Sequence, residues 1–151
     1  ESIRDPLLIR GPGISPGRVV GKIVANVDLT PTILEITGAT LTLPQDGKSL
    51  LPLIANENIP WRENFLIENP RGESYVGLRG LKYKYVQYDY NNDDAIDEEE
   101  LYNFAPDACS LNADPYELTS RHADSCYAPL LQEFRNRVDI LKDCVGVNEC
   151  W

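Results

Sequence analysis

Apolar residues change their spacing along the chain near Trp61, and this change divides the sequence into two parts. Before Trp61, apolar runs predict strands at Pro6–Arg10 and Lys22–Ala25. The first run is unbroken, which is typical of a strand buried on both faces of a sheet. The pattern then predicts a helix that ends at Gly38 and one or two helical turns at Ser49–Ala55.

The helix that ends at Gly38 has recognisable residues at both ends. Asp28 or Thr30 can cap its amino terminus. Pro31 suits the first turn, because proline lacks the N–H group that a helix interior needs. The same helix has an apolar face, made of Leu29, Ile33, Leu34 and Ile36.

From Trp61 onward, short alternating runs separated by turn residues predict an antiparallel meander. Its four strands are expected at Phe65–Glu68, Tyr75–Arg79, Tyr83–Tyr88 and Glu100–Phe104. A longer helix follows at about Pro129–Cys144, and its apolar stripe predicts that it packs across one face of the sheet. We therefore expect an α/β fold in which residues 1–60 end an α/β core and residues 61–151 form an antiparallel-sheet subdomain.

Composition and charge exclude several classes of protein. The 151 residues contain 14 Lys+Arg against 24 Asp+Glu, a formal charge of −10, which would repel nucleic acid phosphates. No apolar run approaches the roughly 20 residues that span a bilayer. The first residue is Glu1, so any signal peptide is expected to lie upstream or to have been removed.

The cysteines indicate disulfides rather than a zinc site. Four cysteines allow three pairings, and the non-crossing set of Cys109–Cys126 with Cys144–Cys150 is favoured. A zinc site needs closer ligand spacing, and His122 is the only histidine. Disulfides imply passage through an oxidising compartment.

The acidic stretch after the third predicted strand partly matches a calcium loop. Oxygen ligands fall at positions 1, 3, 5, 9 and 12 of an EF-hand pattern, at Asp89, Asn91, Asp93, Asp97 and Glu100. Asp94, however, occupies the position where the sharp turn needs glycine, and the flanks are predicted strands. A solvated acidic hairpin loop is therefore the favoured interpretation.

Several short sequence segments, in the same order and over nearly the whole chain, resemble segments of the sulfatase family of the alkaline-phosphatase-like superfamily. They are Pro6-Leu-Leu-Ile-Arg-Gly-Pro-Gly-Ile14, Asn26-Val-Asp-Leu-Thr-Pro-Thr-Ile-Leu-Glu-Ile-Thr-Gly38, Asp46-Gly-Lys-Ser-Leu-Leu-Pro52, Gly77-Leu-Arg79 with Tyr83-Lys-Tyr85, Glu100-Leu-Tyr-Asn103 and Asp114-Pro-Tyr-Glu-Leu118. Within the family, Val24–Asp28 and the ending Cys144–Cys150 resemble N-acetylglucosamine-6-sulfatases. The resemblance implies a carboxy-terminal portion of a sulfatase, secreted or lysosomal.

The resemblance also implies which chemistry the chain lacks. Sulfatases cleave sulfate esters with a formylglycine made in a Cys-x-Pro-x-Arg context, and calcium and basic groups neutralise the sulfate oxygens. None of the four cysteines has this context; Cys126, for example, is followed by Tyr-Ala-Pro-Leu. The family's nucleophile, calcium ligands and catalytic Lys and His residues correspond to sequence before Glu1. The chain alone is therefore expected to be inactive and to associate with an amino-terminal catalytic portion.

Within the chain, Arg71, Arg79 and Lys82 are the candidates for contact with a sulfated or acidic substrate, because the meander turns face the active-site cleft in the family. The competing interpretation is that they are solvated sheet-edge charges. Trp61 and Arg62 suit either a sugar-stacking platform or burial between the two parts, and burial is favoured. A different class of function also stays open, a non-enzymatic extracellular module derived from a sulfatase.

Overall fold

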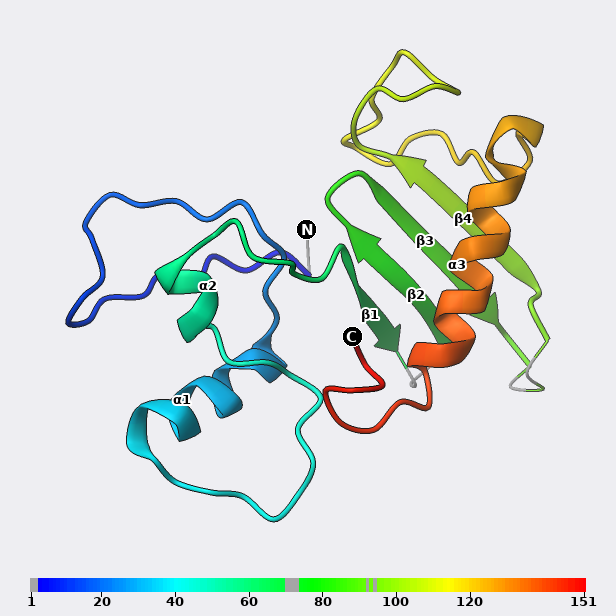
Figure 1. Cartoon of the computed structure of the whole chain (residues 1–151). Helices are drawn as coiled ribbons and strands as arrows, with labels where there is room; N and C mark the ends of the chain where they lie inside the picture. The colour runs from blue at the N-terminus through cyan, green and yellow to red at the C-terminus, as the bar shows by residue number, and fades with distance from the viewer. Residues whose placement is uncertain (1–2, 70–73, 92, 94) are drawn as a thin grey trace.

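A computed structural model describes residues 3–69, 74–91, 93 and 95–151 (Figure 1). The amino-terminal segment, residues 3–60, contains η1 (Asn26–Asp28), α1 (Leu29–Thr37) and α2 (Leu51–Ala55). The sheet unit, residues 61–151, contains β1 (Asn64–Asn69), β2 (Ser74–Gly80), β3 (Tyr83–Asp89), β4 (Glu98–Asn103), η2 (Ser125–Tyr127) and α3 (Ala128–Leu141). None of the described helices has both the length and the apolar character that crossing a membrane requires.

The four strands form one antiparallel sheet in the order β1-β2-β3-β4, so each strand pairs with its neighbour in sequence. The predicted meander and its packed helix are confirmed, with strand ends that differ by a few residues. A row of apolar residues crosses all four strands in register, from Leu66 through Leu78 and Tyr85 to Leu101. This row forms one face of the core.

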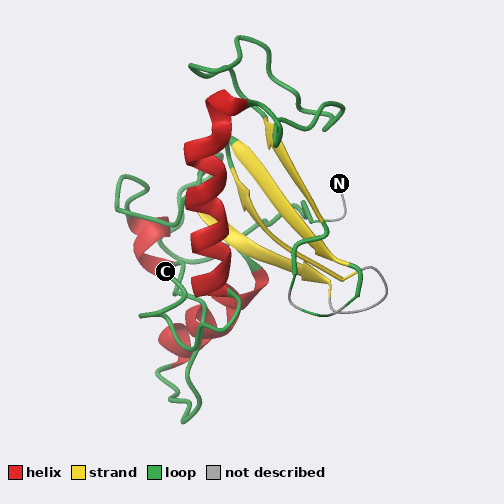
Figure 2. Ribbon diagram, turned by 90° about the vertical axis from the view of Figure 1, so that its right-hand side faces the viewer, coloured by secondary structure: helices red, strands yellow, loops and turns green. Residues whose placement is uncertain are grey.

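Helix α3 lies across that face, as Figures 1 and 2 show. Its buried residues recur at helical spacing and meet the apolar row; they are Leu131, Phe134, Val138 and Leu141. Arg135 of α3 forms an ion pair with Glu99 of β4. The hydrogen bonds from Arg135 hold the pKa of Glu99 below its usual value. Helix and sheet are therefore joined by an apolar core with a charged pair beside it.

The two strands predicted in the amino-terminal segment are not formed. Residues 6–10 and 22–25 are irregular chain, and Leu8 is 94% exposed where a buried strand was expected. A strand is stable only when its N–H and C=O groups bond to a neighbour, and in the described chain the strands lie between Asn64 and Asn103. The apolar run at Pro6–Arg10 therefore lacks a sheet to join.

Helix α1 begins and ends as predicted, but its apolar face is not covered. Gly38 ends it in the left-handed conformation, with φ of 68°. Asp28 occupies the capping position without a side-chain capping bond. The only buried residue of α1 is Thr32, whereas Ile33 is 59% and Ile36 is 65% exposed. The apolar face thus points to solvent in this chain.

Helix α2 anchors a second, smaller apolar cluster. Leu50 and Leu53 pack there with Trp61, which begins the sheet unit. Gly47 lies where the chain passes so close to the backbone of Val27 that a Cβ atom would come 2.0 Å from the Val27 carbonyl oxygen. Only glycine fits this approach.

Candidate functional site

The face of the sheet opposite α3 carries a row of cationic and aromatic residues. The register places Phe65, Arg79, Lys84 and Tyr102 side by side across the four strands. Because side chains alternate between faces, this row lies on the side that α3 leaves uncovered (Figure 2). We call these four residues the open-face row.

Arg79, like Lys84, is a half-buried cation of this row. Its guanidinium carbon lies 3.7 Å from the centre of the Phe104 ring, and Nη1 donates to the carbonyl oxygen of Gly80 at 2.9 Å. Burial lowers the pKa of Arg79; the nearby carboxylate of Glu117 acts in the opposite direction, and the charge of Arg4 lowers the pKa further. Arg79 has no ion-pair partner among the described residues.

Lys84, by contrast, has an acid partner. It forms an ion pair with Glu117, and its ammonium group lies 5.7 Å from the centre of the Tyr102 ring. Glu117 has a φ of 56°, an uncommon conformation for a residue with a side chain. The preceding Asp114 holds this turn, because its carboxylate accepts from the N–H groups of Leu118 and Thr119. The turn directs Glu117 towards Lys84.

The three residues predicted to contact substrate differ in what the structure describes of them. Arg79 lies in the open-face row, Lys82 is exposed in the turn between β2 and β3, and Arg71 lies outside the described residues. Lys84 was not among the predicted contacts. Its place beside Arg79 depends on the strand register, and the only signal in the sequence was the alternation of Tyr83, Lys84 and Tyr85.

The acidic stretch forms a hairpin loop whose described carboxylates bond within the loop. Asp89 accepts from the N–H of Asp93, and Asp97 accepts from the N–H of Tyr90. Glu100 lies in β4, where it accepts from the hydroxyl of Tyr88. No group of three or more His, Cys, Asp or Glu in the described chain could hold a metal ion. These hydrogen bonds join the described carboxylates to other residues of the loop and of β3.

Arg62 and Asp28 join the sheet unit to the amino-terminal segment. Arg62 donates from Nη2 to Oδ1 of Asp28 at 2.6 Å and from Nη1 to Oδ2 at 3.0 Å. The Asp28 side chain is fully buried, and the Arg62 side chain is 8% exposed. The N–H groups of Ala25 and Lys48 complete the hydrogen bonds of the carboxylate. Asp28, a candidate cap for α1, instead binds Arg62 and so joins the amino-terminal segment to the sheet unit.

Trp61 is buried beside this ion pair and donates from Nε1 to the carbonyl oxygen of Ile23 at 2.7 Å. Trp61 is therefore buried between the two parts of the chain, which is the interpretation that the sequence favours. A cavity of about 560 Å³ lies at the same junction, with Val24, Arg62, Leu66 and Lys142 in its lining.

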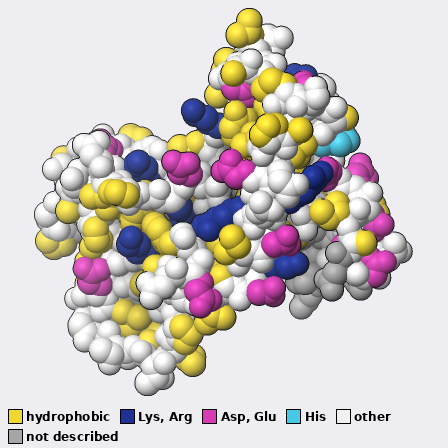
Figure 3. Space-filling model, turned by 45° about the vertical axis from the view of Figure 1, so that its right-hand side comes forward, with side chains coloured by type: hydrophobic (Ala, Val, Ile, Leu, Met, Phe, Trp, Pro, Cys, Tyr) yellow, Lys and Arg dark blue, Asp and Glu magenta, His cyan; other side chains and the backbone are white. Residues whose placement is uncertain are grey.

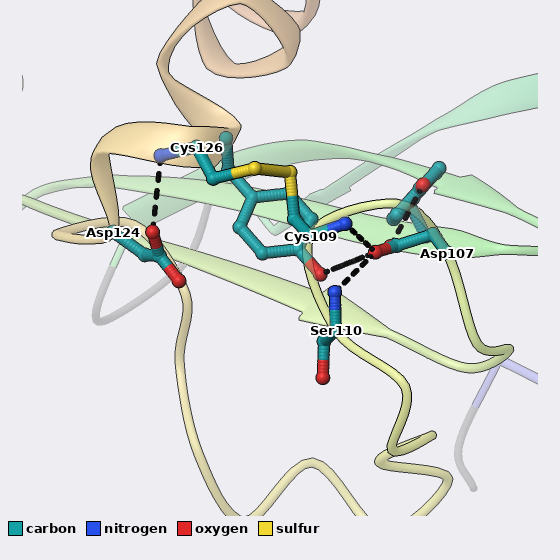
Figure 4. The surroundings of a disulfide bond; sticks show 7 residues. Asp107, Cys109, Ser110, Asp124 and Cys126 are labelled. Carbon is teal, nitrogen blue, oxygen red and sulfur yellow. Dashed lines mark hydrogen bonds between the residues drawn. A yellow bond between two sulfur atoms is a disulfide. The ribbon is translucent and has the colours of Figure 1, made fainter.

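The structure contains the disulfide pairing that the sequence favoured, Cys109–Cys126 and Cys144–Cys150. Next to the first disulfide, Asp107 accepts from the N–H groups of Cys109 and Ser110 at 2.8 and 2.7 Å (Figure 4). This bridge therefore lies in a hydrogen-bonded loop.

The carboxylate of Asp107 also binds two tyrosines of the core. It accepts from the hydroxyls of Tyr83 in β3 and Tyr127 in η2, each at 2.9 Å. Burial by itself would raise the pKa of Asp107, but its hydrogen bonds lower the pKa below its usual value. Burial raises the pKa of Tyr127 to about 12. Asp107 thus ties the disulfide loop to both the sheet and the start of α3.

His122 is exposed, and its Nδ1 lies 2.9 Å from the hydroxyl oxygen of Ser120. Ser120 belongs to a loop that runs beside β4, where its hydroxyl oxygen accepts from the N–H of Leu101. Its surroundings are those of a surface loop.

Comparison with known proteins identifies the class to which this fold belongs. The sequence model of one family, "N-sulphoglucosamine sulphohydrolase, C-terminal", matches residues 1–143. The chain therefore belongs to this family of sulfatase carboxy-terminal regions, which confirms the resemblance seen in the sequence.

Among individual proteins, the chain is similar to N-acetylglucosamine-6-sulfatase. It is 48% identical to the enzyme of Bos taurus over 95% of this chain and 30% of the bovine protein. It is 50% identical to the Homo sapiens enzyme over 44% of this chain and 12% of that protein. A choline-sulfatase of Rhizobium meliloti is 36% identical over 79% of this chain and 21% of its own length. The chain thus spans less than a third of each of these relatives.

A solved structure supports the same assignment. A protein in complex with its substrate, D-glucosamine-2-N, 6-O-disulfate, matches 76% of this chain and 23% of its own chain, with a TM-score of 0.59 and 26% identity. The sheet with its packed helix is therefore the fold of a sulfatase carboxy-terminal region.

Proposed function

We propose that this chain is the carboxy-terminal portion of a secreted or lysosomal sulfatase that hydrolyses sulfate esters of sugars or aryl alcohols. It completes the fold and supplies one wall of the substrate cleft, while an amino-terminal catalytic portion supplies the nucleophile and binds calcium. The family match over residues 1–143 carries the proposal. The two disulfides support an oxidising compartment.

The exposed apolar surface of the amino-terminal segment supports an association with a catalytic portion. Large apolar side chains reach the surface there, as Figure 3 shows over the left-hand part of the molecule. They include Leu8, Val19, Ile33, Ile36 and Leu43, with exposed fractions of 94, 85, 59, 65 and 72%. Exposed large apolar side chains gathered on one segment favour a surface that a partner covers. The apolar run at Pro6–Arg10 would find its missing neighbours in such a partner.

The assay that tests this function compares the full-length protein with residues 1–151 alone, on 4-nitrophenyl sulfate and on sulfated glucosamine. The full-length protein is expected to release sulfate, and the chain alone to release none above the buffer rate. Sulfate release by the chain alone would contradict the proposal. A full-length protein that is folded but hydrolyses no sulfate ester would favour the non-enzymatic module.

Within this function, Arg79 is proposed to contact an anionic group of the substrate. The Arg79 guanidinium is half-buried and has no acid partner among the described residues. A positive charge partly removed from water is stabilised by a nearby negative group, so this site favours the binding of an anion. The nearby charge of Arg4 adds to the attraction. Exposed Lys82 stands at the same end of the sheet and is proposed as a weaker contact; Arg71 is retained as a candidate from the sequence alone.

Replacing Arg79 with alanine in the full-length protein is expected to lower kcat/KM for a sulfated sugar about tenfold or more, the scale of one lost charged hydrogen bond. Exposed Lys22 provides a matched control, and Lys22→Ala should leave kcat/KM unchanged. Arg79→Lys keeps the charge but not the planar geometry and should show an intermediate loss. If Arg79→Ala leaves kcat/KM unchanged, Arg79 does not contact the substrate.

A further inference from the structure

The last residues of the chain turn back onto the amino-terminal segment. After α3, the Cys144–Cys150 disulfide closes a short loop with a sequence separation of 6. Gly146 takes a φ of 81° in this loop, and its carbonyl oxygen accepts from the N–H groups of Glu149 and Cys150, each at 3.1 Å. The N–H of Gly146 donates to Oδ1 of Asp46 at 2.8 Å. The loop therefore touches the segment that precedes the sheet.

Trp151, which directly follows Cys150, covers the ion pair at the junction. Its ring meets that of Trp61 edge to face, with centroids 4.7 Å apart. The guanidinium carbon of Arg62 lies 4.3 Å from the centre of the Trp151 ring, and the ammonium nitrogen of Lys48 lies 4.6 Å from it. Trp151 thus contacts residues from both parts of the chain, and stacking on cations adds to its hydrophobic contact.

We propose that the Cys144–Cys150 disulfide is a redox-sensitive latch. It holds Trp151 over the ion pair of Arg62 and Asp28, and its reduction frees the amino-terminal segment from the sheet unit. Between Lys142 and Cys150 no residue is fully buried, and Cys144, near the start of the loop, is the residue that packs against the main core. The disulfide is what keeps Trp151 close to Arg62, and both of its cysteines are only half-buried, within reach of a reductant.

A dithiol supplies the electrons and protons that reduce the Cys144–Cys150 disulfide. Two electrons and two protons pass to the sulfur atoms of Cys144 and Cys150, which become two thiols, and the dithiol closes to its own disulfide. Cys109 and Cys144 both pack against the main core of the sheet unit. The two disulfides differ in what they hold: Asp107 ties the Cys109 loop to Tyr83 and Tyr127 of the sheet unit, whereas Cys150 leads directly into Trp151 at the junction. Loss of Cys109–Cys126 should loosen the sheet unit itself, whereas loss of Cys144–Cys150 should loosen only the junction.

Hydrogen exchange read by mass spectrometry on the full-length protein tests the latch. The N–H groups of Ala25 and Lys48 report on the junction, because both donate to Asp28. In the double variant Cys144→Ser with Cys150→Ser, exchange at these two amides is expected to rise tenfold or more, while the amides of the β2–β3 ladder stay within twofold. Dithiothreitol on the Cys109→Ser with Cys126→Ser variant, in which Cys144–Cys150 is the remaining disulfide, should further raise exchange at Ala25 and Lys48.

Two further variants separate the latch from general stabilisation. Trp151→Ala keeps the disulfide and should also raise exchange at Ala25 and Lys48. The double variant Cys109→Ser with Cys126→Ser should instead raise exchange across β2 and β3. The latch is overturned if the loss of Cys144–Cys150 leaves Ala25 and Lys48 unchanged or speeds exchange equally in the sheet. It is also overturned if Trp151→Ala has no effect at the junction.

Discussion

Replacing Arg62 with alanine is expected to lower the free energy of unfolding by about 3–5 kcal/mol, the usual cost of leaving a buried charge without its partner. Asp28 is fully buried and receives two hydrogen bonds from Arg62, at 2.6 and 3.0 Å. The N–H groups of Ala25 and Lys48 would remain, but neither carries a charge. Urea unfolding followed by tryptophan fluorescence measures the loss, because Trp61 and Trp151 both lie beside the pair.

Two companion variants show whether the cost comes from the buried charge. Arg10 is an exposed arginine of the amino-terminal segment, and Arg10→Ala should change the free energy of unfolding by less than about 0.5 kcal/mol. Adding Asp28→Asn to Arg62→Ala removes the unpaired charge and should restore part of the stability. If Arg62→Ala changes the free energy of unfolding by less than about 1 kcal/mol, the buried charge of Asp28 does not need Arg62 for its stabilisation.

The elements that could be predicted from sequence are those whose partners lie close along this chain. Alternation in Tyr75–Arg79 and Tyr83–Tyr88 predicted two strands that pair directly with each other. The stripe in the last helix predicted a buried face, and the sheet to cover it lies in the same unit. For Pro6–Arg10 the pattern was equally clear, but in the described structure the run joins no sheet and Leu8 is 94% exposed.

The junction was beyond the reach of pattern reasoning. The sequence pattern gives Asp28 a local role only, as one of two candidate helix caps with Thr30, while its partner Arg62 is 34 positions away. Nothing in the spacing of these residues distinguishes a capping carboxylate from one that binds a distant arginine. Trp151 likewise has no local signal, because its contacts with Trp61 and Arg62 arise only after the Cys144–Cys150 loop has formed. The family resemblance made Arg79 a candidate, whereas the position of Lys84 beside it follows only from the strand register.

Replacing Phe134 with alanine is expected to cost about 3–5 kcal/mol of unfolding free energy, the range for a large aromatic residue removed from a core. Phe134 is 7% exposed, and its ring centre lies 6.1 Å from that of Tyr83 and 6.0 Å from that of Tyr85. The cavity would open between α3 and the middle of the sheet. Urea unfolding followed by far-ultraviolet circular dichroism reports on this helix and sheet.

Ile140 of the same helix is the matched control, because it is 57% exposed on the face turned away from the sheet. Ile140→Ala removes a large apolar side chain from the same helix, yet it should cost less than about 0.5 kcal/mol in the isolated chain. Equal losses for Phe134→Ala and Ile140→Ala would contradict the packing of α3. A loss at Ile140 that is found only in the full-length protein would instead show that another part of that protein covers the outer face of α3.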